Sequence, residues 1–159
     1  MKKIFFLIPF LLVVSCSDSS FDPTLLSDGF KGITHTGPES PQPLGGMYDP
    51  SDWCTGKSNG FNKEKTDIVV PNSFAFYPCY PNPISINGKT TLQFSLPQDS
   101  FVNLYIIDKY NHILYTLLYT NISAGVHSVM FDSQGYQKGI YRFIIETEQN
   151  TCKGDLWIK

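Results

Sequence analysis

The chain reads Thr91-Leu92-Gln93-Phe94-Ser95-Leu96 in its second half, with a large apolar side chain at every second position. Because successive side chains of a strand point to opposite faces of a sheet, this alternation predicts a strand with one buried face. The same period of two returns in three later stretches. We therefore expect one common core formed by Leu92, Phe94, Leu104, Ile106, Val129, Phe131, Tyr141 and Phe143.

Eight candidate strands follow from this pattern and from the turn residues that separate them. They cover residues 67–70, 73–77, 90–96, 101–107, 112–119, 126–131, 140–147 and 151–158. Short strands that start about every 10–12 residues, without helical periodicity, are typical of antiparallel sandwiches. Residues 66–159 are therefore predicted to form an all-β domain, an antiparallel β-sandwich of about seven strands.

The composition supports a folded protein and argues against nucleic-acid binding. Charged residues make up 16% of the chain and aromatic residues 14%, which argues against a wholly disordered chain. The formal net charge is -2, and the 12 lysines and arginines form no cluster. A protein that binds nucleic acid needs a basic patch, so no nucleic-acid partner is expected.

The N-terminus reads as an export signal. Lys2 and Lys3 precede an apolar run over residues 4–14, which is too short for a membrane span of roughly 20 residues. Residues 1–15 are predicted to be a lipoprotein signal peptide, because Leu12-Val13-Val14-Ser15-Cys16 matches the bacterial lipobox. Lipid on the Cys16 sulfur would anchor the chain to a membrane. Ser17 replaces the aspartate of the inner-membrane retention signal, so we expect the outer membrane, on its periplasmic or its cell-surface face. An ordinary secretory signal with a chance cysteine is the alternative.

Residues 16–65 are predicted to be the lipidated cysteine and an extended tether arm. The stretch from Gly37 to Gly46 holds three prolines and three glycines and is expected to form no regular structure. Met47-Tyr48-Asp49-Pro50-Ser51-Asp52-Trp53-Cys54 differs from the rest of the arm. Its turn residues surround an indole that would gain from burial, which predicts a docked Trp53.

Four ordered blocks in residues 70–159 resemble a known family. The first runs from Val70 to Pro83 and contains Tyr80-Pro81-Asn82-Pro83; the others cover residues 89–97, 102–108 and 123–143, and the chain ends on Lys159. Together they resemble the type IX secretion C-terminal sorting domain (type A), which is similar to the Ig-like domain of flagellar hook-capping proteins. This resemblance implies an Ig-like β-sandwich. The sorting-motif positions that it assigns are Tyr80, Pro81, Asn82, Pro83, Gly139, Tyr141 and Lys159.

One departure from the family concerns a turn. The family usually has glycine after its Asp-x-x turn, where this chain has Asn111. Asparagine tolerates the left-handed backbone conformation better than most residues, so the turn is expected to survive.

No catalytic or cofactor motif accompanies the sandwich pattern. The three histidines lie far apart, and neither a zinc-ligand spacing, a phosphate loop nor a nucleophile motif is present. Asp99, Asp108 and Asp132 fall at strand ends, where capping of turns is the expected role. We expect no enzyme, no metal and no cofactor.

Three cysteines remain once Cys16 carries lipid. An exported protein favours one disulfide and one free thiol. The favoured pair is Cys54 with Cys152, because it would fasten the arm to the sheet; Cys79 with Cys152 is the alternative, and sequence alone does not decide.

The sequence therefore predicts a membrane-anchored bacterial lipoprotein. Its non-catalytic Ig-like module would serve envelope structure or bind a protein partner at the cell envelope. The alternative is a type IX secretion substrate whose C-terminal domain is a sorting signal, with the secretion machinery as its partner.

Overall fold

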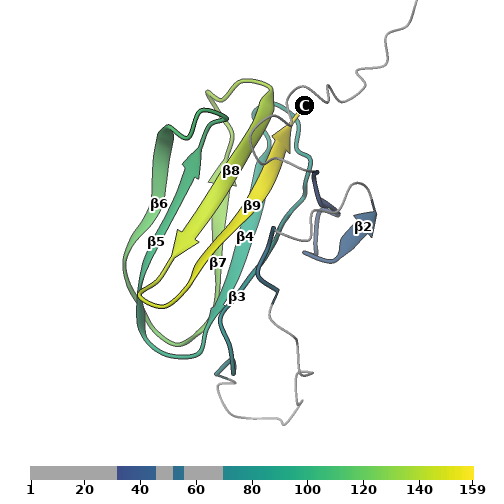
Figure 1. Ribbon diagram of the computed structural model, residues 1–159. Coiled ribbons are helices and arrows are strands. Elements are labelled where there is room, and N and C mark those ends of the chain that lie inside the picture. Colours follow the sequence, from purple (N-terminus) through teal and green to yellow (C-terminus); the bar gives the residue numbers. More distant parts are fainter. Residues whose placement is uncertain (1–31, 46–51, 56–69) are drawn as a thin grey trace, which may run out of the picture.

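The computed structural model describes residues 32–45, 52–55 and 70–159 (Figure 1). Within these ranges every regular element is a strand, and none is a helix that could cross a membrane. The strands are β1 (His35–Thr36), β2 (Pro43–Gly45), β3 (Ala75–Tyr80), β4 (Lys89–Leu96), β5 (Ser100–Ile107), β6 (Ile113–Ile122), β7 (Gly125–Asp132), β8 (Gly139–Glu146) and β9 (Thr151–Ile158).

Two antiparallel sheets pack face to face and confirm the predicted sandwich. The three-stranded sheet has the order β3-β4-β7, and the four-stranded sheet has the order β6-β5-β8-β9. These seven strands come from the predicted domain, while β1 and β2 pair separately within the arm. The fold is thus all-β and consistent with an Ig-like sandwich, with nine strands in the described part of the chain.

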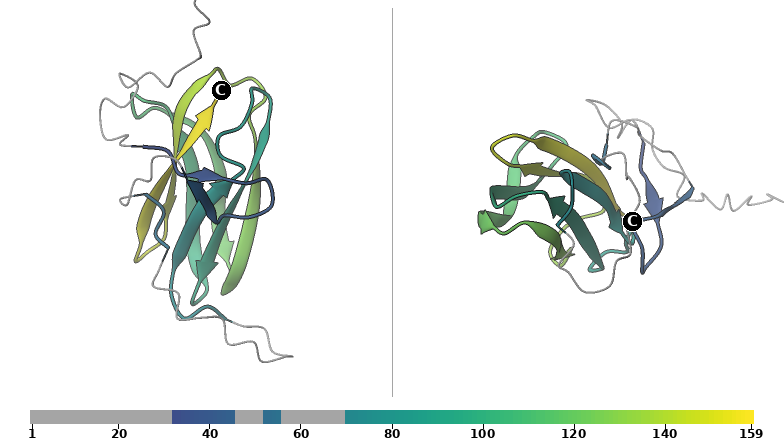
Figure 2. Two further views of the ribbon diagram at one scale, coloured as in Figure 1. Left: turned by 90° about the vertical axis from the view of Figure 1, so that its right-hand side faces the viewer. Right: turned by 90° about the horizontal axis from the view of Figure 1, so that it is seen from below.

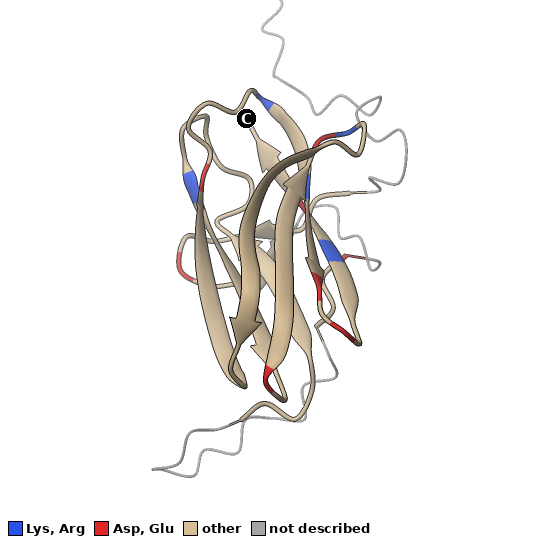
Figure 3. Cartoon of the chain, turned by 90° about the vertical axis from the view of Figure 1, so that its left-hand side faces the viewer, with Lys and Arg blue, Asp and Glu red and all other residues tan. Residues whose placement is uncertain are grey.

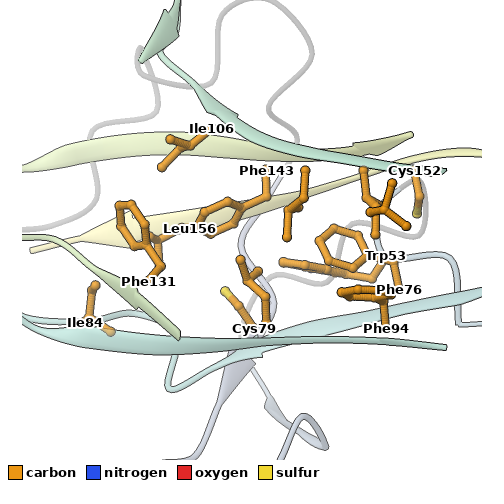
Figure 4. Close-up of a cluster of buried hydrophobic side chains, with 14 of the residues drawn as sticks. Trp53, Phe76, Cys79, Ile84, Phe94, Ile106, Phe131, Phe143, Cys152 and Leu156 are labelled. Carbon is orange, nitrogen blue, oxygen red and sulfur yellow. The ribbon is translucent and has the colours of Figure 1, made fainter. Parts of the chain in front are cut away.

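The core lies between the inner faces of the two sheets (Figure 4). Six of the eight predicted core side chains are buried: Leu92, Phe94, Leu104, Ile106, Phe131 and Phe143. Val129 and Tyr141 are half-buried and pack against the edge of the core. Both lie toward the margin of the sandwich, where the sheets no longer cover each other completely.

The strand boundaries follow the predictions within a few residues in most cases, with two differences. β3 begins at Ala75 and continues to Tyr80, through a register shift against β4 that the alternation did not show. Val70 lies outside any strand, and residues 67–69 of the first predicted strand lie outside the described residues. Asn111 adopts a φ of 66°, so the turn survives there as expected.

The arm is more ordered than its composition predicts. β2 falls inside the stretch 37–46 for which no regular structure was expected, and this prediction was wrong. Pro43 lies opposite Thr36, and Gly45 lies opposite His35. Proline and glycine are tolerated in such a short outer strand, because no strand pairs with its far side in the described part of the chain.

The arm also covers one side of the sandwich, next to β3 and β9 (Figure 2). Ile33, Thr34 and Thr36 are buried there, although the sequence showed no alternation around them. The Thr36 amide donates to the Asn82 carbonyl. Residues 32–36 therefore pack as part of the domain.

Candidate functional site

Trp53 occupies a prepared place between the two sheets. The indole is buried, and its ring centroid lies 5.0 Å from that of Phe76 (Figure 4). A Cβ atom at Gly154 would overlap the indole, so β9 can pass this ring only with glycine at that position. The prediction of a docked Trp53 is confirmed.

The backbone around Trp53 joins the two sheets. The Trp53 amide donates to the Lys153 carbonyl in β9, and the Phe76 amide in β3 donates to the Cys54 carbonyl. Residues 52–55 thus bridge the edges of the two sheets. On this side the arm closes the sandwich.

The Cys54–Cys152 disulfide fastens the same segment to β9, which confirms the favoured pairing. Cys79 is the free cysteine of the described residues, and it is buried. Burial raises the pKa of the Cys79 thiol to about 12. Because the thiolate is the reactive form, Cys79 is inert in the folded protein.

A buried group of charges lies beside this bridge. Arg142 donates two hydrogen bonds to Asp155, from Nε to Oδ1 at 2.6 Å and from Nη2 to Oδ2 at 2.8 Å. Both residues are almost fully buried, and the β8–β9 register places them directly opposite each other. Asp52 from the arm lies next to Asp155, with its Oδ1 3.8 Å from Lys153 Nζ.

Burial raises the pKa of the Asp155 carboxyl, while the Arg142 guanidinium opposes that rise. The two carboxylates, Asp52 and Asp155, are closed off from solvent, whereas the Lys153 side chain is about one-third exposed. The charges of the cluster neutralise one another, as buried charges must. Its arrangement therefore fits a structural role in holding the arm.

The segment Tyr80-Pro81-Asn82-Pro83 forms a clamp between the arm and β9. The Asn82 amide nitrogen donates to the Thr34 carbonyl at 3.1 Å and to the Asp155 carbonyl at 2.8 Å. Its Oδ1 accepts from the Trp157 amide at 3.0 Å. The peptide bonds before Pro81 and Pro83 are both cis. The Asn82 side chain is fully buried and makes all three hydrogen bonds, two as donor and one as acceptor. An amide side chain is needed at this position because it can donate and accept at once.

The other positions that the family resemblance singled out lie partly at the same end of the sandwich. The Lys159 amide donates to the Ile84 carbonyl, which directly follows the clamp. Gly139, with a φ of 157°, lies opposite Ile158. Tyr141 lies on the inner face of β8, near the margin of the core, and its hydroxyl donates to the Gln137 carbonyl. The structure thus brings Asn82, Gly139 and the chain end together.

Strand-end carboxylates cap turns, as the sequence predicted. Asp108 Oδ1 accepts from the amides of Tyr110 and His112, and Asp99 Oδ1 accepts from the Ala124 amide. Asp132 Oδ1 accepts from the Gln134 amide, which lowers the pKa of Asp132, as does Lys89 nearby. No group of three or more His, Cys, Asp or Glu in the described ranges is placed to hold a metal ion.

An apolar surface lies along β6, on the side opposite the arm. Large apolar side chains expose much of their area on β6 (Ile113, Leu114, Tyr115 and Tyr119), in the turn before it (Tyr110) and on β7 (Met130). A groove of about 390 Å³ opens between the two strands, lined mainly by Tyr115, Leu117, Val129 and Tyr136. We call this the β6 surface.

The β6 surface carries almost no charge. None of the ten residues of β6 is charged, and Asp132 is the charged residue of β7, at its very end. In Figure 3, seen from the side on which β6 lies in Figure 1, the strands nearest the viewer are tan over most of their length. Several exposed large apolar side chains along one strand are a feature of interaction sites.

Sequence reasoning did not identify the β6 surface, although one signal was present. Residues 112–119 were predicted as a strand, but Ile113, Leu114, Tyr115, Leu117 and Leu118 do not alternate. That dense apolar run was a sign of large side chains on both faces. Cys16 lies outside the described residues.

Neither a protein-family model nor a curated protein matches this sequence. The function is therefore argued from the residues and from the geometry described above.

Proposed function

We propose that this protein is a membrane-anchored bacterial lipoprotein whose Ig-like sandwich is a non-catalytic protein-binding module of the cell envelope. The β6 surface is the observation that supports binding most directly. It presents uncharged, apolar side chains to solvent, whereas Asp99 at a strand end caps a turn and the buried Asp155 is paired with Arg142.

The way in which the arm is attached to the sandwich supports an anchored module. Residues 52–55 are bound by a disulfide, by a buried indole and by two backbone hydrogen bonds. A force transmitted through the chain from an anchor at Cys16 would therefore act on β3 and β9. These strands lie at the side of the sandwich opposite β6. The β6 surface would remain exposed to partners.

The anchor is tested by the substitution Cys16→Ser. Without the sulfur, diacylglycerol has no attachment point, so the variant should incorporate no fatty acid and should retain its signal peptide. Metabolic labelling with a clickable fatty acid, followed by gel fluorescence, measures this. A control variant, Cys79→Ser, alters a buried thiol and should label like the wild type. Equal labelling of Cys16→Ser and the wild type would refute the anchor.

The second candidate is a type IX sorting signal, which the resemblance of Tyr80-Pro81-Asn82-Pro83 and the chain end favours. Under this hypothesis the C-terminal domain would be removed at the cell surface. A C-terminal epitope tag separates the two functions. We expect the tag to stay with the membrane fraction at full mature mass. Loss of the tag from surface protein, reversed when the type IX machinery is disabled, would support the sorting signal instead.

A further inference from the structure

The outer face of the four-stranded sheet carries a group of polar side chains that hold one another in place. β5 lies between β6 and β8 in this sheet (Figure 1), and Asn103 of β5 lies directly opposite Glu146 of β8. The Glu146 carboxylate accepts from Asn103 Nδ2 at 3.0 Å and from the Tyr105 hydroxyl at 3.1 Å. Leu104, between the two donors, is buried in the core, so the polar group points away from it.

Two aromatic rings continue the same face. Phe101 lies two residues before Asn103 on β5, and Tyr119 lies opposite Asn103 on β6. The centroids of these two rings are 4.8 Å apart at an interplanar angle of 89°, so they pack edge to face. Along β5, Phe101 and Tyr105 are separated by four residues, or about 13 Å in a strand. We call Phe101, Asn103, Tyr105, Tyr119 and Glu146 the β5 platform.

The β5 platform keeps hydrogen-bonding capacity for a ligand. Among the described residues, each Glu146 oxygen receives one hydrogen bond, although a carboxylate oxygen can accept two. The Asn103 amide has a second N–H and a carbonyl oxygen beside the bond to Glu146. All five side chains of the platform are at least partly exposed, so a ligand can reach these groups.

The chemistry of the platform favours a polyhydroxylated ligand. A protein partner would bury the Glu146 carboxylate, and glutamate is depleted from the cores of protein interfaces. A nucleic acid would bring its phosphates against the same negative charge. The hydroxyls of a sugar can donate to a carboxylate and accept from an amide, while the apolar C–H face of a pyranose ring packs on an aromatic ring.

We propose that the β5 platform binds a neutral polysaccharide. Sugar hydroxyls donate to Glu146 and accept from Asn103, and pyranose rings pack on Tyr105 and on the pair of Phe101 and Tyr119. The separation of these rings along the strand suits a chain of sugars rather than a single sugar. Apart from Tyr119, the platform is distinct from the β6 surface, so this second binding activity goes beyond the proposed function.

Affinity electrophoresis tests the proposal. The unlipidated mature chain, residues 16–159, is run through native gels that contain dextran, mannan, xylan or hydroxyethylcellulose, with the acidic polysaccharide alginate for comparison. We expect slower migration in at least one of the neutral gels and unchanged migration in alginate. Tyr105→Ala and Glu146→Gln should each weaken binding about tenfold or more, because they remove a stacking ring and a charged acceptor. Tyr77→Ala, which changes a partly exposed tyrosine of the other sheet, is the matched control and should bind like the wild type.

A second substitution separates binding from folding. Tyr105→Phe keeps the ring and removes only the donor to Glu146, so its affinity should lie between those of the wild type and Tyr105→Ala. Thermal unfolding shows which variants are folded. Unchanged migration of the wild type in every neutral gel, or equal retardation of the wild type, Tyr105→Ala and Glu146→Gln, would overturn the proposal. Retardation in alginate alone would contradict a neutral ligand. None of these results depends on lipid at Cys16, so the proposed function is tested separately.

Discussion

Trp53→Ala is expected to lower the free energy of unfolding by about 3–5 kcal/mol, the usual cost of deleting a large buried aromatic side chain. The indole is buried between the sheets, against Phe76 and Gly154. Its removal leaves a cavity, because the disulfide at Cys54 prevents the arm from moving away. Urea unfolding of the oxidised protein, followed by far-UV circular dichroism, measures the change.

Two controls make this result specific. Ile86→Ala removes a side chain that is about half exposed and should change the free energy of unfolding much less. Gly154→Ala should destabilise the wild type, because its Cβ would overlap the indole, but it should cost little in the Trp53→Ala background. Equal destabilisation by Trp53→Ala and Ile86→Ala would contradict the buried position of Trp53.

Arg142→Met is expected to have a comparable effect, again about 3–5 kcal/mol, because it leaves Asp155 buried without its guanidinium. The double variant Arg142→Met/Asp155→Leu removes the isolated charge as well. It should regain most of the lost stability, since apolar residues of similar size often replace a buried pair at little cost. Thermal unfolding of the three proteins checks the order: wild type and double variant above Arg142→Met.

The Arg142→Met variant should also respond differently to pH. Burial already raises the pKa of Asp155, and loss of Arg142 removes the main opposing contact. The folded variant then holds a proton on Asp155 at pH values where the unfolded chain has released it. Its stability should therefore fall as pH rises from about 4 through the raised pKa, more steeply than in the wild type. If the stability of the variant changed with pH in the same way as that of the wild type, the pKa of Asp155 would not be raised by burial, which would contradict this prediction.

Local patterns predicted the sandwich because its strands alternate. Leu92 and Phe94 repeat with a period of two, and the turns between strands carry residues such as Asn111 that accept a left-handed backbone. The Cys54–Cys152 disulfide was the favoured pairing, because it would fasten the arm to the sheet, but the sequence alone left Cys79–Cys152 open. These features depend on neighbouring residues or on simple pairing rules.

The docking of the arm was less predictable because its contacts are distant in the sequence. Thr34 is held by Asn82, 48 residues away, and Asn82 in turn accepts a hydrogen bond from Trp157, 75 residues away. Arg142 and Asp155 meet only through the register of β8 and β9. The proline and glycine content of residues 37–46 suggested an irregular tether. In the structure the short strand β2 forms within this stretch.

Intact mass of the protein purified from native membranes tests the central proposal most directly, because one spectrum reports the lipid, the disulfide and the C-terminus. We predict a chain that starts at Cys16, carries acyl groups, lacks two hydrogens through the Cys54–Cys152 bond and ends at Lys159. A mass without lipid, or one that lacks the sandwich of residues 70–159, would contradict the account of an anchored binding module.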